Sequence, residues 1–416
     1  MDKEFEYKEE YGWLTNICLN VTDACNLACR YCFVEQHPHY MTLDIAKKAV
    51  TFILDNLEKK NKMFNKNDRA SITYFGGEPT LMWDEIIVPL TLYIKENDFP
   101  IDLSITTNGT LLNKERILFL KENDFSMLLS IDGDKATQDY NRPCQNSLLS
   151  SFEMIEKNIP IILENFPNII FRSTIYAPTV ENTFNNYAFA MRQGFKNIFM
   201  MPDARNPWSE EQKNILNKEL GKIFALIDWC YSNELEPMGF STINDLYKKM
   251  LEHDILVYNN IIPDLNISRS VMRCGLGTTF GSIGYDGSIF GCQEQTSKSK
   301  NNIFYLGNIL NSAPIDQQRH INLLQEYNKM FISECENKTM CSECSLRNVC
   351  HGFNCPSSSY DLLNNFTTNK EISCLWHQWL FNNAIILNNK MVSENNQVFK
   401  NYLENICQFN TKLKEA

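Results

Sequence analysis

The chain has 416 residues, of which 44% are hydrophobic and 21% charged, and its net charge at pH 7 is −11. This composition excludes an intrinsically disordered chain, and an acidic chain without a basic block argues against nucleic-acid binding. The longest apolar runs are too short to span a bilayer, and the N-terminus lacks the features of a signal peptide. Fifteen cysteines in such a chain are expected to be reduced thiols that serve metal binding or catalysis. We therefore expect a soluble cytoplasmic protein without a membrane or nucleic-acid partner.

The first 200 residues alternate short β-rich runs with helical patterns. Strands are predicted over residues 14–21, 70–75, 101–106, 126–131, 169–175 and 196–201. Helices are predicted over 43–60, 84–97, 113–123 and 181–194, with Thr42 as an N-cap and Gly194 as a C-terminal stop. Strands that alternate with helices pair in parallel through right-handed crossovers. Six such units predict an α/β fold, a partial (β/α)6 barrel with its site at the C-terminal ends of the strands.

The pattern predicts five segments along the chain. They are an N-terminal extension (1–13), the partial barrel (14–205), a helical linker (206–270), a small cysteine-rich domain (271–375) and a helical tail (376–416). The linker contains a long amphipathic stretch over residues 209–235. The cysteine-rich segment has little regular periodicity, and a region without a large core of its own can be held together by metal.

Three cysteines, Cys25, Cys29 and Cys32, follow the first predicted strand within DACNLACRYCF (23–33). Their spacing is Cys-x3-Cys-x2-Cys, and Tyr31 precedes the third thiol. Three thiolates on one loop can bind three irons of a [4Fe–4S] cluster and leave the fourth iron open. A zinc loop is the alternative, although structural zinc sites prefer four closed ligands. The spacing therefore favours an iron–sulfur site.

This loop resembles the defining motif of the radical S-adenosylmethionine (SAM) enzymes, Cys-x3-Cys-x-aromatic-Cys. The resemblance covers roughly residues 14–205 and continues at the ends of later strands, in FGGEP (75–79), TTNGTLL (106–112), SIDGD (130–134) and DYNRP (139–143). Each short motif is weak alone, and their order makes them specific together. The resemblance implies that SAM is bound by Tyr31, Gly76, Gly77, Glu78, Asn108, Ser130, Asp132 and Arg142. In this interpretation the glycines let the backbone approach the methionine amino group, and Glu78 is its anionic neighbour.

Cysteines become frequent again from Cys274 onward. Cys274 and Cys292 enclose the pattern Cys-x12-Gly-x4-Cys, with Gly287 in a predicted hairpin turn. One or two zinc-ribbon sites are the alternative. The arrangement instead resembles the SPASM extension of radical SAM enzymes, with one departure: four residues separate Cys350 from Cys355 where the SPASM pattern has three. The resemblance implies a proximal auxiliary cluster on Cys274, Cys292 and Cys355, and a distal one on Cys341, Cys344, Cys350 and Cys374. Three [4Fe–4S] clusters are expected in total.

The fourth ligand of the proximal cluster is undetermined by the sequence. Residues 264–273, where relatives with a complete proximal cluster carry an additional cysteine, contain none. We expect an open iron that meets a substrate thiol, and the alternative is that Cys335 fills the position. The remaining cysteines are expected to be ordinary small residues, namely Cys18, Cys144, Cys230 and Cys407.

The resemblance implies an oxidoreductase that cleaves SAM reductively to a 5′-deoxyadenosyl radical. Its partners would be a peptide or protein substrate and an electron donor such as a flavodoxin or ferredoxin. The expected reaction is a thioether crosslink in a ribosomally made, cysteine-rich peptide (a RiPP). About a dozen residues precede the first strand, so leader-peptide binding is expected in a separate protein or in the C-terminal helices. Carbon–carbon and carbon–oxygen crosslinks and epimerisation also stay open.

Two alternatives remain. Formylglycine-forming sulfatase maturases carry an Asp directly after the second motif cysteine, where this chain has Gln293, which cannot accept a proton. Glu294 is the candidate base in its place, although a solvated loop residue is at least as good an interpretation. The other alternative is a non-catalytic zinc or iron–sulfur structural protein, and the motifs at successive strand ends argue against it.

Overall fold

The computed structural model describes residues 12–235, 237, 239–240, 243, 275–336, 357, 360 and 371–404. The chain forms two compact units. The first unit comprises Met1–Ser130, Arg142–Phe166 and Ser270–Ser333, and the second comprises Ile131–Asn141, Pro167–Arg269 and Glu334–Ala416. No described helix is both long enough and apolar enough to cross a membrane.

Four parallel strands form the centre of the first unit. They are β1 (Asn16–Thr22), β2 (Ala70–Gly76), β3 (Ile101–Thr107) and β4 (Ser126–Ser130), paired in that order. Strand β1 is buried at all but its first residue, as expected for a parallel strand covered on both faces. These four predicted strands are confirmed to within two residues at each end.

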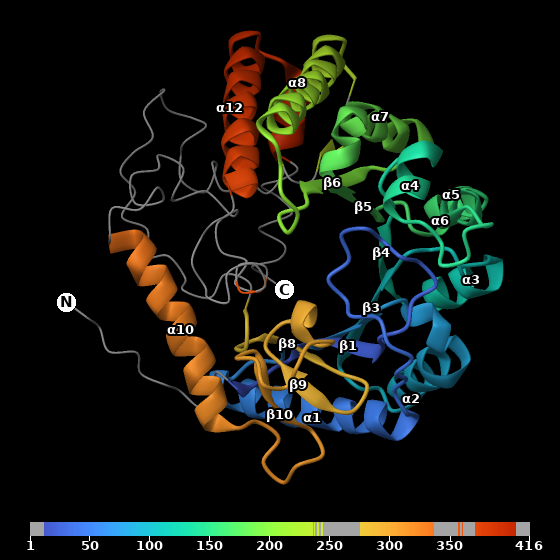
Figure 1. Ribbon diagram of the computed structural model, residues 1–416, viewed down its shortest axis with the longest axis vertical. Coiled ribbons are helices and arrows are strands. Elements are labelled where there is room, and N and C mark those ends of the chain that lie inside the picture. The colour runs from blue at the N-terminus through green and yellow to red at the C-terminus, as the bar shows by residue number, and fades with distance from the viewer. Residues whose placement is uncertain are drawn as a thin grey trace. The chain divides into compact units, whose positions relative to one another are not determined.

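Helices connect these strands as the periodicity predicted. The first is α1 (Leu43–Phe64), which packs against β1 and β2, and the Thr42 side chain caps it by accepting the N–H of Ile45 (Figure 1). The others in this unit are η2 (Pro79–Met82), the π-helical turn η3 (Trp83–Ile87), α2 (Val88–Glu96), α3 (Lys114–Glu122), α5 (Ser151–Glu156) and α6 (Ile159–Asn165). The short helices α5 and α6 were not predicted.

Three further strands extend this sheet from a part of the chain distant in sequence. Strand β8 (Phe280–Ile283) pairs in parallel with β1, and β9 (Ser288–Phe290) and β10 (Tyr305–Asn308) continue antiparallel. Gly287 has a φ of +81° in the turn between β8 and β9, which confirms the predicted hairpin. The turn η5 (Gln293–Gln295) follows β9, and helix α10 (Gln317–Glu336) follows β10. Apart from this hairpin, the sequence predicted no strand after Cys274, because strands of three or four residues carry too little alternation.

The second unit pairs β5 (Ile170–Ile175), β6 (Asn197–Pro202) and β7 (Gly239–Phe240) in parallel. Its helices are α4 (Lys135–Asn141), η4 (Ala177–Asn182), α7 (Thr183–Gln193), α8 (Glu210–Ser232) and α12 (Glu371–Ser393). Gly194 ends α7 in the left-handed conformation, as predicted. Helices α8 and α12 lie side by side (Figure 1), and two lysines join them through Lys213–Glu371 and Lys390–Asp228 ion pairs.

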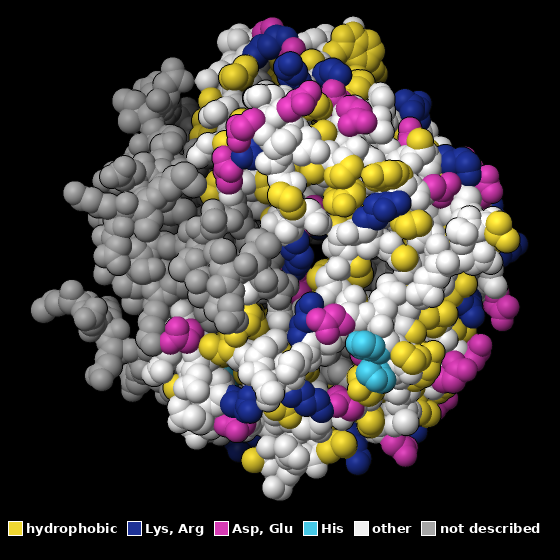
Figure 2. Space-filling model, viewed as in Figure 1, with side chains coloured by type: hydrophobic (Ala, Val, Ile, Leu, Met, Phe, Trp, Pro, Cys, Tyr) yellow, Lys and Arg dark blue, Asp and Glu magenta, His cyan; other side chains and the backbone are white. Residues whose placement is uncertain are grey.

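Charged side chains of both signs are mixed over the surface. On the face shown in Figure 2, Lys and Arg side chains of the described residues are interspersed with Asp and Glu side chains. Cys18 and Cys230 are buried in the core, as the sequence predicted for ordinary small residues.

Candidate active site

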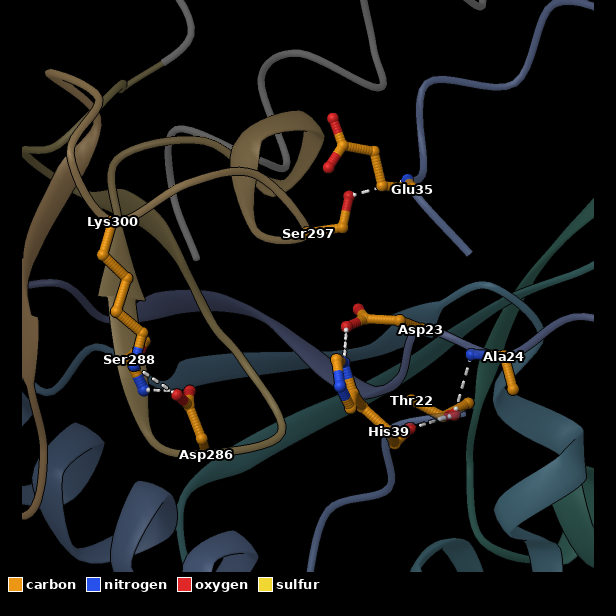
Figure 3. Close-up of polar contacts among 9 residues, drawn as sticks. All are labelled: Thr22, Asp23, Ala24, Glu35, His39, Asp286, Ser288, Ser297 and Lys300. Atoms are coloured by element: carbon orange, nitrogen blue, oxygen red, sulfur yellow. Dashed lines mark hydrogen bonds and ion pairs between the residues drawn. The ribbon is translucent and has the colours of Figure 1, made fainter. Parts of the chain in front are cut away.

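The three cysteines lie on a loop of residues 23–33, the cysteine loop, which leaves the C-terminal end of β1. The hydroxyl of Thr22 donates to the carbonyl of His39 (2.6 Å) and accepts the N–H of Ala24 (3.0 Å), as Figure 3 shows. The N–H groups of Gly77 and Glu78 donate to the carbonyls of Thr22 and Ala24, both at 2.9 Å. Backbone hydrogen bonds therefore fasten the start of the cysteine loop to the end of β2.

Gly76 and Gly77 make this contact possible. A Cβ on Gly76 would lie 2.2 Å from the carbonyl oxygen of Thr22, and one on Gly77 would lie 2.2 Å from that of Ala24. Gly76 also has a φ of +139°, which residues with a side chain rarely adopt. The close approach that the structure shows at these glycines is that of the chain's own cysteine loop. Their predicted contact with SAM stays a prediction.

The segment after α4 fastens the other side of the cysteine loop. The N–H of Ala28 donates to the carbonyl of Pro143 (2.8 Å), and Leu27 forms a β-bridge with Cys144. The guanidinium of Arg142 lies 5.4 Å from the centre of the Tyr31 ring, a cation–π distance. Two predicted SAM contacts, Tyr31 and Arg142, are thus brought together beside the third cysteine.

The three thiols have the chemistry of cluster ligands. None of the three is in a disulfide, and exposure increases from partly buried Cys25 and Cys29 to exposed Cys32. Burial raises the pKa of the Cys25 thiol above its usual range, and the negative charge of Glu78 and of the other two sulfurs raises it further. A thiolate here therefore needs a positive charge, which the irons of a cluster would supply. Among the described residues, no group of three or more His, Cys, Asp or Glu side chains could hold a single metal ion. A [4Fe–4S] cluster does not need such a group, because each of its thiolates binds a different iron.

Glu78 is buried and holds the ends of β2 and β3 together. Its Oε1 accepts from the N–H and hydroxyl of Thr80 (3.0 and 2.5 Å) and from the hydroxyl of Thr107 (2.8 Å). Its Oε2 accepts the N–H of Asn108 (2.7 Å). Burial raises the pKa of Glu78, and these donors act in the opposite direction. Four protein donors therefore occupy most of the acceptor capacity that we expected to meet the SAM ammonium.

The substitution Glu78→Gln should destabilise the first unit although it preserves shape. An amide has one acceptor oxygen where the carboxylate has two, so a buried N–H of Thr80 or Asn108 loses its acceptor. An unsatisfied buried donor costs about 1–3 kcal/mol. Urea unfolding of the metal-free protein measures the loss, and Glu58→Gln on the exposed face of α1 is the matched control. Equal unfolding midpoints for the two variants would contradict this role of Glu78.

Asn108 connects the end of β3 to the first cysteine. Its side-chain Nδ2 lies 3.0 Å from Oδ1 of Asn26 and 3.8 Å from Sγ of Cys25. Its Oδ1 accepts from the N–H and the hydroxyl of Thr110 (3.0 and 2.6 Å). Asn108 and Thr110 are both buried, so the hydrogen bonds between them are shielded from water.

Ser130 and Asp132 fall in different units. Ser130 is the last residue of β4 in the first unit and is half-buried. Asp132 belongs to the second unit, where its carboxylate accepts the N–H of Thr174 and the amide of Asn141, both at 3.0 Å. The hydroxyl of Ser173 donates to its backbone carbonyl (3.1 Å). Asp132 therefore joins α4 to β5 within the second unit.

Most of the auxiliary-cluster cysteines lie outside the described residues. These are Cys274, Cys341, Cys344, Cys350 and Cys355, and Cys407 and the side chain of Cys335 are also outside. Cys292 is buried directly before η5 in the first unit, and Cys374 is partly buried in α12 of the second. Glu294, the candidate base, lies in η5 and is half-buried. The two auxiliary cluster assignments therefore remain predictions.

The sequence did not predict a polar cluster that lies beside the three cysteines. Asp23 is 3% exposed, and its Oδ2 lies 3.2 Å from Nδ1 of His39, whose ring stacks on that of Tyr285 (4.4 Å between centres). Further along the same segment, the N–H of Glu35 donates to the hydroxyl of Ser297 (3.0 Å; Figure 3). Glu35 and His39 thus contact Ser297 and Tyr285, which lie after and before Cys292 in the chain. These partners are about 250 residues away in sequence, so no local sequence pattern could predict the contacts.

The part of the chain that carries this site is similar to a known protein family. Residues 19–185 match the family model described as the radical SAM superfamily. The chain is 27% identical over 349 residues to the radical SAM cyclopropyl synthase TigE of Paramaledivibacter caminithermalis, which covers 81% of this chain and 66% of TigE. It is also 35% identical over 98 residues to GTP 3′,8-cyclase 1 of Mycobacterium tuberculosis. That match covers 23% of this chain and 25% of the cyclase.

Solved structures share the fold. Native anSMEcpe with bound AdoMet and Cp18Cys peptide superposes with a TM-score of 0.66 at 19% identity, covering 91% of this chain and 99% of that one. Streptococcus suis SuiB bound to its precursor peptide SuiA superposes with a TM-score of 0.53 at 15% identity, covering 87% and 76%. The shared fold and the cysteine loop at the end of β1 agree with the match of residues 19–185 to the radical SAM superfamily model.

Proposed function

We propose that this protein is a radical SAM maturase that crosslinks a ribosomally made, cysteine-containing peptide. The observation that carries the proposal is the loop of three cysteines outside any disulfide at the end of β1. Gly77 and Glu78 hold one side of this loop, and Pro143 and Cys144 hold the other. A cluster on Cys25, Cys29 and Cys32 and a SAM bound beside it would supply a 5′-deoxyadenosyl radical. The chain's own residues would position the cluster and exclude water from it.

A peptide substrate is supported by two structures that share this fold. One contains the Cp18Cys peptide and the other the precursor peptide SuiA. An electron donor such as a flavodoxin or ferredoxin would supply the electron that cleaves SAM. We also propose auxiliary clusters on the cysteines from Cys274 onward, in the arrangement of a SPASM domain, and a leader-binding function in a separate protein or in the C-terminal helices.

The proposed bond is a thioether. The substrate carbon loses a hydrogen atom to the 5′-deoxyadenosyl group, the thiol loses its proton, and the carbon–sulfur bond forms. One electron is then released, which an auxiliary cluster would accept, so the peptide loses two hydrogens and its thiol. An open iron on the cluster of Cys274, Cys292 and Cys355 would bind the substrate sulfur.

Closure of a carbon–carbon ring is the second candidate, and the likeness to the cyclopropyl synthase TigE favours it. It also removes two hydrogens but leaves any substrate thiol intact. Formylglycine formation is less well supported, because Gln293 stands directly after Cys292 and cannot act as a base. Glu294 is the carboxylate available there.

The three outcomes are distinguished by incubating the anaerobically reconstituted protein with SAM, dithionite and synthetic peptides. The panel contains cysteine peptides, their Cys→Ser counterparts and the Cp18Cys peptide. We expect a product that lacks two hydrogens and no longer reacts with iodoacetamide, and no product from the Cys→Ser peptides. A product that keeps its thiol reactivity indicates carbon–carbon bond formation. An aldehyde that reacts with a hydrazide indicates formylglycine.

A further inference from the structure

We propose that Asn108 is a positioning residue for the Cys25 thiolate, acting through an N–H···S hydrogen bond, and that its side chain does not bind SAM. This inference rests on the proposed function, because it assumes that Cys25 binds a [4Fe–4S] cluster. The distance that carries it is 3.8 Å between Nδ2 of Asn108 and Sγ of Cys25. Asn108 is 6% exposed and Cys25 is partly buried, so the donor end of this contact is shielded from water.

The orientation of the Asn108 amide follows from one neighbour. A backbone N–H only donates, and that of Thr110 lies 3.0 Å from one end of the amide. That end must therefore be the oxygen, and the NH₂ end must face Asn26 and Cys25. The hydrogen bond to sulfur thus does not depend on an arbitrary choice between amide nitrogen and oxygen.

Three side chains then form a closed ring of hydrogen bonds with a single direction. Asn108 donates to Oδ1 of Asn26 (3.0 Å), Asn26 donates to the hydroxyl of Thr110 (2.7 Å), and Thr110 donates to Oδ1 of Asn108 (2.6 Å). One amide hydrogen of Asn108 is used in the ring, and the other faces Cys25. Both acceptor sites of its oxygen are used by Thr110. An amide offers two donors and two acceptor sites, so none is left for a methionine or ribose group of SAM.

The backbone of Asn108 is held as firmly as its side chain. Its N–H donates to Glu78 (2.7 Å), and the hydroxyl of Thr107 donates to the same carboxylate while accepting the N–H of Gly109. The donor is therefore preorganised toward the sulfur. A preorganised donor loses little freedom when charge develops on its acceptor.

Such a hydrogen bond affects the electron affinity of the cluster. Reduction adds negative charge to the cluster and its thiolates, so a donor to the sulfur stabilises the reduced state more than the oxidised state. The carboxylate of Glu78, which accepts the backbone N–H of Asn108 at 2.7 Å, brings negative charge to the same place and has the opposite effect. Asn108 therefore offsets the buried carboxylate and raises the reduction potential of the cluster.

The test compares Asn108→Ala with Thr110→Val in EPR-monitored redox titrations of the reconstituted protein without SAM. The signal of a Cys25→Ala/Cys29→Ala/Cys32→Ala variant is subtracted to isolate this cluster. At the potential where wild type is half reduced, Asn108→Ala should lower the reduced-to-oxidised ratio about three- to tenfold, since tenfold corresponds to about 59 mV for one electron. Thr110→Val breaks the ring of side-chain hydrogen bonds but keeps the backbone N–H of residue 110 and the contact between Asn108 and Cys25. The reduced-to-oxidised ratio of the cluster should therefore change less than about twofold.

An isosteric variant covers the case in which Asn108→Ala does not fold. Asn108→Asp keeps an oxygen that accepts from Thr110 but replaces the NH₂ donor with a second oxygen, which carries negative charge. It should therefore lower the reduced-to-oxidised ratio more than Asn108→Ala does. Asn113→Asp is the control, because Asn113 is the exposed N-cap of α3 and Asp caps a helix as well as Asn does. It adds the same negative charge and should leave the reduced-to-oxidised ratio unchanged.

Three results would overturn the inference. One is an unchanged potential in both Asn108 variants, and another is an equal shift in Thr110→Val. The third is weaker SAM binding in Asn108→Ala, measured by equilibrium dialysis, with the potential unchanged, which would make Asn108 a SAM contact. If wild type itself gives no signal beyond that of the three-cysteine variant, the proposed function fails and this inference with it.

Discussion

The Cys29→Ala variant should release no 5′-deoxyadenosine from SAM, whereas wild type should release it under anaerobic conditions with dithionite. Two thiolates cannot hold the cluster that three support, because each thiolate binds its own iron. Cys29 lies in the middle of the cysteine loop, where its carbonyl also accepts the N–H of Cys32 at 3.1 Å. Loss of one thiol at this position therefore removes a ligand without removing a side chain from the core.

Iron analysis distinguishes loss of the cluster from loss of the fold. A variant with all three cysteines changed to alanine should lose roughly four irons per chain relative to wild type. Cys230→Ala is the matched control, because Cys230 is a buried thiol of α8 in the second unit and should leave the iron content unchanged. Intact iron in wild type together with no 5′-deoxyadenosine would contradict the proposed chemistry.

The Gly77→Ala variant should lose its cluster although no ligand is changed. The added methyl group would lie 2.2 Å from the carbonyl oxygen and 2.6 Å from the carbonyl carbon of Ala24, and both are backbone atoms that cannot rotate away. Gly77 does not have a positive φ, so the effect is purely steric. Overpacking of this kind costs about 1–3 kcal/mol, and here the strain is relieved by displacing the cysteine loop.

Gly221→Ala provides the control for this substitution. Gly221 lies in α8 with no atom within 4 Å of an added Cβ, so alanine should stabilise the helix by about 0.5–1 kcal/mol. Iron content and thermal unfolding are measured for both variants. Iron retained in Gly77→Ala at the wild-type level would show that the cysteine loop tolerates displacement and would refute the steric argument.

The six predicted strands and the first helix were accessible from the sequence because their signals are local. Strands β1 to β6 are short apolar runs bounded by turn residues, and α1 has a threonine cap three residues before the N–H that it binds. The spacing of Cys25, Cys29 and Cys32 is likewise a property of eight consecutive residues. Each of these patterns involves residues close together in the chain, so the local amino-acid sequence is enough to predict it.

The roles of the residues around those cysteines were decided only by the tertiary structure. Parallel pairing of β1, β2 and β3 brings Asn26, Glu78 and Asn108 together, and Asn26 and Asn108 are separated by 82 positions in the chain. The sequence predicted that Glu78 and Asn108 contact SAM, and this stays a prediction; the structure adds hydrogen bonds from Asn108 to Glu78 and from Thr110 to Asn108, which the sequence did not predict. A hydrogen bond between distant side chains leaves no periodicity in the sequence, so it becomes visible only when strand pairing has placed its partners side by side.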